Sequence, residues 1–168
     1  MLFRYFFATL IILAMPCQAK YAPHGKISMQ GSILDSSCSI SLNSQYQDIL
    51  IKTVPVGELL HNGYGPVTPL NIKLDNCSNV PGEYRFRVTF DGDNAGDGRF
   101  GFTGSAEGIS MRISTIQGEE AQPGIPMSEG QLSAGMNVLK YQLRLVGNDQ
   151  DLKAGDYQTL LRMKLDYY

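Results

Sequence analysis

The last fifteen residues, AGDYQTLLRMKLDYY (residues 154–168), carry the pattern that decides the fold. Every second side chain belongs to a mainly apolar set: Tyr157, Thr159, Leu161, Met163, Leu165 and Tyr167. The side chains between them are mostly polar. A period of two is typical of a β-strand with one buried face. The pattern therefore predicts a strand that reaches the penultimate residue, although chain ends usually fray. Such a strand needs a partner.

The rest of the chain is a series of short strand patterns separated by Gly, Pro, Asn and Asp. We expect strands within residues 26–34, 48–54, 69–77, 84–90, 108–115 and 138–146, and a weak one within 98–104. Residues 91–98 are expected to form a hairpin loop. No segment shows a sustained helical repeat, and residues 57–65 offer at most one turn of helix. Short strands separated by turns predict an all-β sandwich.

The N-terminus has the features of a secretory signal peptide. Arg4 precedes an apolar run from Tyr5 to Met15, and small residues lead to an expected cleavage after Ala19. The run is too short to span a bilayer comfortably. An alternative is lipid attachment at Cys17, which the preceding Met and Pro fit poorly. We therefore expect a signal peptide at residues 1–19 and an exported protein.

Composition indicates one globular domain and argues against several kinds of partner. The chain has 168 residues, with 43% hydrophobic and 18% charged. Removal of residues 1–19 takes away one of the 14 basic residues and none of the 16 acidic ones, so the net charge becomes 13 − 16 = −3. The sequence has no stripe of basic residues that would bind nucleic acid and no polybasic segment that would bind an anionic membrane.

Two cysteines remain after the signal peptide, Cys38 and Cys77. A pair of cysteines in an oxidising compartment predicts a disulfide. Loop-closure entropy for positions 39 apart gives a stabilisation of about 4 kcal/mol. The alternative is two buried free thiols.

Catalytic and metal-binding motifs are weak in this sequence. The two histidines, His24 and His61, lie in no ligand-spaced motif, and no Gly-x-Ser-x-Gly sequence is present. The acidic stretch DGDNAGDG (residues 91–98) suggests calcium, but the EF-hand pattern is not met. The sequence thus predicts a protein that is not an enzyme, with no metal, cofactor or small-molecule substrate.

Three features together resemble the subunits (pilins) of chaperone–usher pili. They are the cysteine pair, the alternating leader GKISMQG (residues 25–31), and the terminal strand with Gly155 fourteenth from the end and Tyr167 penultimate. The resemblance implies an incomplete immunoglobulin-like β-sandwich that lacks its last strand and is completed in trans by a donor strand. It implies as partners a periplasmic pilus chaperone, the outer-membrane usher and neighbouring pilus subunits, and a location in the fimbrium at the cell surface.

The resemblance also assigns roles to residues. Residues 20–31 become a donor-strand extension, in which one face carries Gly25, Ile27, Met29 and Gly31. Residues 32–168 become the pilin domain. The strand that the chaperone grips, beside the open groove, would carry Gly155, Tyr157, Thr159, Leu161, Met163, Leu165, Tyr167 and Tyr168. An alternative for residues 25–31 is an ordinary first strand.

The expected role is that of a one-domain minor subunit. Residues 55–77 and 138–168 resemble the terminating subunits that anchor P-type pili at the base, whose groove accepts no further strand. The alternatives are an adaptor or rod subunit. An alternative of another class is a self-contained glycan-binding sandwich with exposed tyrosines, for which Tyr46, Tyr64 and Tyr84 are the candidates.

Overall fold

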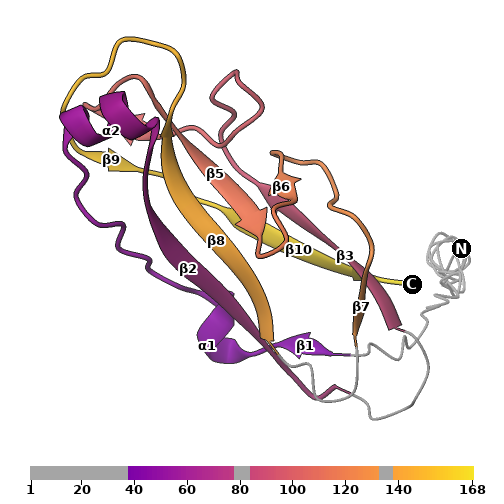
Figure 1. The fold of residues 1–168 in the computed structure, drawn as a ribbon. Helices are drawn as coiled ribbons and strands as arrows, with labels where there is room; N and C mark the ends of the chain where they lie inside the picture. The colour runs from indigo at the N-terminus through magenta and orange to yellow at the C-terminus, as the bar shows by residue number, and fades with distance from the viewer. Residues whose placement is uncertain (1–37, 78–83, 133–137) are drawn as a thin grey trace, which may run out of the picture. The chain divides into compact units, whose positions relative to one another are not determined.

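The computed structural model describes residues 38–77, 84–132 and 138–168. The predicted signal peptide and the predicted donor-strand residues Gly25, Ile27, Met29 and Gly31 lie outside the described residues. The described part contains ten strands and two short helices. The strands lie in two main layers, with β2, β8 and β5 in front of β3 and β10 in the view of Figure 1.

The larger layer is a five-stranded antiparallel sheet in the order β1-β2-β8-β5-β6. Its bounds are β1 Ser39–Ile40, β2 Tyr64–Asp75, β8 Val138–Gly147, β5 Ile109–Thr115 and β6 Glu120–Ala121. The second layer is a three-stranded sheet in the order β10-β3-β7, with β10 Arg162–Tyr167, β3 Tyr84–Asp91 and β7 Gly130–Leu132. A separate pair joins β4 Thr103–Gly104 to β9 Tyr157–Gln158.

The core lies between the two layers and follows from the period-two alternation of their strands. Val88 and Phe90 from β3 face Met111 and Ile113 from β5, and all four side chains are at most 2% exposed. The ring of Phe90 meets the ring of Tyr141 edge-on, with centroids 4.9 Å apart. Edge-to-face packing of this kind stabilises beyond the buried area. The predicted all-β fold and its main strands are confirmed.

A disulfide joins Cys38 to Cys77, as the sequence predicts, with a Cα–Cα distance of 4.1 Å. It links the residue before β1 to a residue just after β2, where Ser39 already pairs with Asp75. Cys38 is 5% exposed and belongs to the core. The bridge therefore fixes β1, the edge strand of the larger sheet, to its neighbour β2.

The helical content is larger than the sequence suggests. Helix α1 spans Leu42–Gln45, and α2 spans Val56–Asn62, about two turns where at most one was expected. Gly63 ends α2 in the left-handed conformation (φ 77°) and its N–H donates to the carbonyl of Leu59 at 2.8 Å. This glycine cap, together with burial of Leu59, stabilises a short helix that lacks an apolar repeat. No helix of the described residues is long and apolar enough to cross a membrane.

Three strand predictions need correction. Residues 48–54 form no strand, and the weak strand at 98–104 shrinks to the two residues of β4. The terminal strand is divided, because β9 pairs with β4 whereas β10 pairs with β3. The chain thus changes partner at residues 159–161, a change that side-chain alternation cannot reveal.

Candidate functional site: an open sheet edge at the C-terminus

Strand β10 forms one edge of the three-stranded sheet. It pairs with β3 without a register shift, from Arg162 opposite Asp91 to Tyr167 opposite Phe86. Within the described residues no strand pairs with its other side. The other edge of the described sheet is β7, which pairs with the far side of β3 but has only three residues against the six of β10. Exposed edges of this kind are templates for pairing with another chain.

The register shows which backbone groups face the open side. The N–H of Tyr168 donates to the carbonyl of Arg85 at 2.9 Å, so residue 168 belongs to the hydrogen-bonded set of the ladder. In an antiparallel pair this set alternates along the strand. The N–H and C=O groups of Met163, Leu165 and Tyr167 therefore point away from β3. These are the groups that an added strand would bond.

The inward side chains of β10 are less covered than those of its partner. Phe86, Val88 and Phe90 on β3 are 8%, 2% and 1% exposed. Met163, Leu165 and Tyr167, directly opposite them, are only half-buried, although they pack against the same core. The difference arises because β3 lies inside the sheet and β10 at its edge. An apolar face remains available beside β10.

A second segment with partly exposed apolar side chains consists of residues 47–55. Ile49 and Ile51 are half-buried and pack against the core, whereas Leu50 between them is 93% exposed. Among the described residues, no backbone hydrogen bond forms from residues 47–54. The side-chain amide of Gln47 donates to the carbonyl of Asn71 on β2 at 3.2 Å, which holds the segment beside the edge of the larger sheet.

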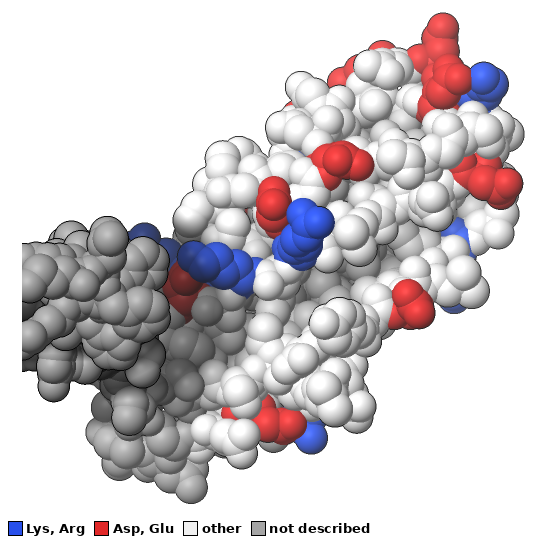
Figure 2. Space-filling model, turned by 180° about the vertical axis from the view of Figure 1, so that it is seen from behind, with Lys and Arg blue, Asp and Glu red and all other residues white. Residues whose placement is uncertain are grey.

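Figure 2 views the molecule from behind, the side on which β10 lies in Figure 1. Lys, Arg, Asp and Glu form small separate groups there, and the surface between them is uncharged and hollowed. Ile49 and Ile51 pack against the same core cluster as Met163 and Leu165 of β10. Ile49 and Ile51 are not among the predicted site residues, because residues 48–54 were expected to form an ordinary strand.

Two buried hydroxyl groups lie along the same strand segment without a partner among the described residues. They are Thr159 Oγ1 and the Tyr167 hydroxyl. Burial also raises the pKa of Tyr167 above its usual value, as it does for Tyr157. A buried polar group without a hydrogen bond is costly. An added strand or an ordered water would lower this cost.

Tyr168 ends the chain on the surface. It is 61% exposed, and its ring lies 5.2 Å from the guanidinium carbon of Arg87. Arg87 is in turn paired with Glu129 at 2.6 Å. The chain end is therefore ordered by β3, and its side chain remains accessible to a partner.

Gly155 has a structural reason to be glycine. A Cβ atom at this position would lie 2.5 Å from the backbone N of Ala106 and 2.5 Å from the Oγ of Ser105. The neighbouring Asp156 accepts backbone hydrogen bonds from Ser105 and Ala106 at 2.9 and 3.2 Å. Close packing here positions β9, from which the chain continues to β10.

In the acidic loop after β3, the Asp97 carboxylate is hydrogen-bonded to neighbouring residues of the same chain. Asp97 accepts hydrogen bonds from the Ser110 hydroxyl at 2.8 Å and from the Arg99 backbone N–H at 2.9 Å. Burial raises the pKa of Asp97, but these bonds and the Arg99 guanidinium outweigh burial and lower it overall. Among the described residues, no group of three or more potential ligands could hold a metal.

Of the tyrosines considered for glycan binding, Tyr46 and Tyr64 lie at opposite ends of β2, because Tyr46 follows α1, where Ser44 bonds Lys73. Tyr46 is 87% exposed, while Tyr64 lies against Arg144, with 4.6 Å between ring centre and guanidinium carbon. The side chain of Tyr84 lies outside what the structure describes.

Comparison with known proteins agrees with the open edge. No family model matches the chain. The PAP and PRS fimbrial minor pilin proteins of Escherichia coli are each 30% identical over 150 residues, which cover 85% of this chain and 77% of theirs. The chain belongs to the chaperone–usher pilin family. The major MR/P fimbria protein of Proteus mirabilis is 26% identical over 149 residues, covering 86% and 84%.

Solved structures show the same fold. The P pilus rod subunit PapA superposes with a TM-score of 0.66 at 20% identity, covering 79% of this chain and all of that one. A subunit of a chaperone–usher pilus superposes with a TM-score of 0.69 at 21% identity, covering 89% and 100%. The protein is thus a structural pilin subunit with an immunoglobulin-like sandwich that lacks one strand.

Proposed function

We propose that this pilin is a minor subunit assembled by donor-strand exchange, and that it terminates and anchors the pilus at its base. The observation that carries the proposal is the open edge of β10 with its half-buried apolar side chains. The mature chain would pass through the periplasm to the fimbrium. It would act by assembly, without enzymatic activity.

In this proposal a periplasmic chaperone first supplies the missing strand. Its strand would bond the outward N–H and C=O groups of Met163, Leu165 and Tyr167, while alternate side chains fill the apolar groove. The exposed end at Tyr168 would be a second point of contact. The chaperone then delivers the subunit to the outer-membrane usher.

The predicted leader, residues 20–31, would complete the groove of a neighbouring subunit. Ile27 and Met29 would be its main anchors, flanked by Gly25 and Gly31 on the same face. Burial of a side chain of this size contributes about 1.5–3 kcal/mol. The domain that remains, residues 32–168, would carry the acceptor groove.

The sequence identities to related proteins favour the role of a minor pilus subunit. Identity is 30% to two minor pilins and 26% to a major fimbrial protein. The terminator role would require that the groove of this subunit accept no further leader. Helix α2 and β9 lie at the same end of the molecule in Figure 1, so α2 is the element we expect to restrict the groove there.

The subunit role is tested by expression with and without a pilus chaperone. We expect the chain alone to aggregate and co-expression to give a soluble complex. Deletion of residues 20–31 should leave chaperone binding intact and abolish donation to a neighbour. A free chain that stays monomeric at high concentration and unfolds with the same midpoint as the chaperone complex would contradict the proposal.

The terminator role is tested by mixing the subunit–chaperone complex with the leader peptide of a neighbouring subunit. A terminator should keep its chaperone for many hours under conditions in which a rod subunit exchanges. Rapid exchange would instead assign an adaptor or rod role, and the subunit role would stand.

A further inference from the structure

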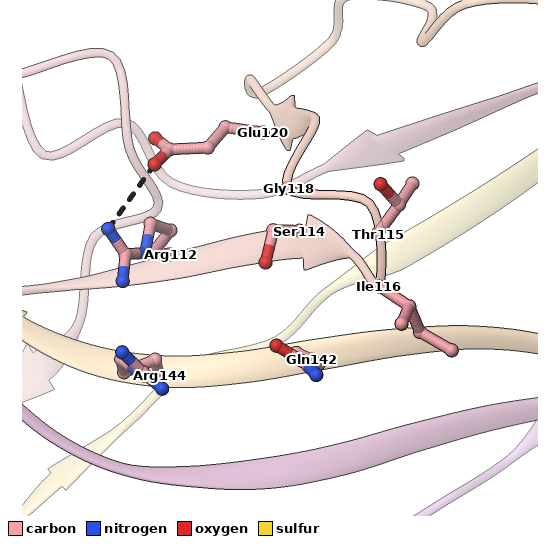
Figure 3. Close-up of a pocket in the computed structure, with 8 residues that line it drawn as sticks. All are labelled: Arg112, Ser114, Thr115, Ile116, Gly118, Glu120, Gln142 and Arg144. Carbon is pink, nitrogen blue, oxygen red and sulfur yellow. Dashed lines mark hydrogen bonds and ion pairs between the residues drawn. The ribbon is translucent and has the colours of Figure 1, made fainter.

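A small pocket lies on the outer face of the larger sheet, away from β10. Its volume is about 220 Å³, and it is lined by residues of β5, β8, β6 and the turn between β5 and β6. Figure 3 shows that the side chains of Arg112, Ser114, Gln142 and Arg144 project from the same face of the two strands. They alternate with buried residues that face the core.

The pocket holds two arginines in an unfavourable position. Arg112 on β5 is the direct cross-strand partner of Arg144 on β8. Like charges opposite each other on one face destabilise an antiparallel pair. The packing of this sheet therefore does not explain why both positions are arginine. An anion that bridges the two guanidinium groups would turn the repulsion into attraction.

The protein neutralises this pair only in part. Glu120 pairs with Arg112 at 3.3 Å and also lies 4.0 Å from Arg99. Arg144 has an aromatic contact with Tyr64, and no carboxylate pairs with it among the described residues. The pocket thus keeps an excess of positive charge, and guanidinium groups bind carboxylates with strong, directed hydrogen bonds.

The remaining lining indicates more than a simple anion. Ser114, Thr115 and Gln142 present hydroxyl and amide groups, and the Glu120 carboxylate can accept hydrogen bonds from ligand hydroxyls. The volume is below the roughly 300 Å³ of the smallest typical drug-sized sites and suits one sugar ring. We propose that this pocket binds a carboxylate-bearing sugar unit of a glycan, such as a uronic acid.

This site is independent of the pilus role proposed above. The pocket belongs to the outer face of the five-stranded sheet, whereas the groove borders β10 in the other sheet. A chaperone or donor strand at β10 would therefore leave the pocket free. The full chain, with a co-expressed chaperone if it needs one, can be used for the test.

Binding is tested by NMR titration of the isotope-labelled chain at low salt with three probes: glucuronic acid, glucose and acetate. We expect saturable shifts of amides in β5 and β8 with glucuronic acid at millimolar affinity. Glucose and acetate should each bind at least tenfold more weakly. Equal binding of glucose would overturn the anionic ligand. Equal binding of acetate would overturn the sugar and favour an acidic side chain of a protein partner.

Matched variants test the residues. Arg144→Gln and Arg112→Gln should each weaken glucuronic acid binding at least tenfold. Lys140→Gln removes a positive charge from the same face of β8, about 13 Å from Arg144 along the strand, and should change affinity less than twofold. The urea midpoint of Arg144→Gln should change little, because relief of the like-charge contact with Arg112 offsets loss of the contact with Tyr64. An equal loss with Lys140→Gln, or unchanged binding in both arginine variants, would overturn the proposal.

Discussion

The side chain of Leu165 on β10 should contribute more stabilising free energy in the complex with an added strand than in the isolated chain. It lies opposite Val88, which is 2% exposed, but is itself only half-buried. Full burial of a leucine contributes about 1.5–3 kcal/mol, so half-burial corresponds to about 1 kcal/mol. A leucine in a closed core costs about 2–5 kcal/mol when replaced by alanine. Leu165→Ala should therefore cost about 1 kcal/mol in the free chain and about 3 kcal/mol once a strand covers it.

The difference of about 2 kcal/mol should be visible in chaperone affinity. It corresponds to a roughly thirtyfold increase in the dissociation constant for the chaperone, which calorimetry or surface plasmon resonance can measure. The cost in the free, refolded chain is measured by urea unfolding with circular dichroism, because the chain contains no Trp. Leu160→Ala is the matched control, since Leu160 is 72% exposed on the adjoining segment. A loss of affinity below threefold for Leu165→Ala, or an equal loss for Leu160→Ala, would refute the reasoning.

Three further predictions concern stability. Replacement of Cys38 and Cys77 together by alanine should lower the free energy of unfolding by about 4 kcal/mol, measured by urea titration; a loss below 1 kcal/mol would contradict the loop-closure account. Gly155→Ala should destabilise the protein by about 1–3 kcal/mol. Gly57→Ala in α2 should be neutral or stabilising, because a Cβ added there has no other atom within 4 Å. Gly155→Ala should therefore lower the thermal midpoint of unfolding and Gly57→Ala should not. Equal shifts in the two variants would count against the packing at β9. In the folded protein the pKa of Asp97 lies below its ordinary value of 3.8, so the ionised carboxylate stabilises the protein above that pH and loses its contribution as pH falls through the folded pKa. Asp97→Asn should therefore flatten the acid side of a stability–pH curve. An unchanged curve would disprove this role.

The sequence predicted much of the fold because its strands follow a simple physical rule. Strands β3, β5 and β8 each bury one face, so alternation alone locates them within a residue or two. The cysteine pair and the predicted export together predicted the disulfide. Gly155 was singled out by its distance from the chain end; the structure shows close packing at this residue, and its role beside the groove stays a prediction.

Other features depend on contacts between distant parts of the chain. Residues 48–54 are apolar-rich like a short strand, yet the described chain offers no ladder to their backbone, and Ile49 and Ile51 instead pack against the core. The division of the terminal strand follows from β4, which lies more than fifty residues earlier. The cross-strand pair Arg112 and Arg144 depends on the register of β5 and β8, which neither segment reveals alone.

Amide hydrogen exchange along β10 tests the central claim most directly. In the free monomeric chain, the amides of Met163, Leu165 and Tyr167 should exchange rapidly, while those of Lys164 and Asp166, on the side of β3, should be protected. Addition of a pilus chaperone should slow exchange at the first three by a large factor and change the other two little. If Met163, Leu165 and Tyr167 are already protected in the free monomer, the edge is not open and the account is contradicted.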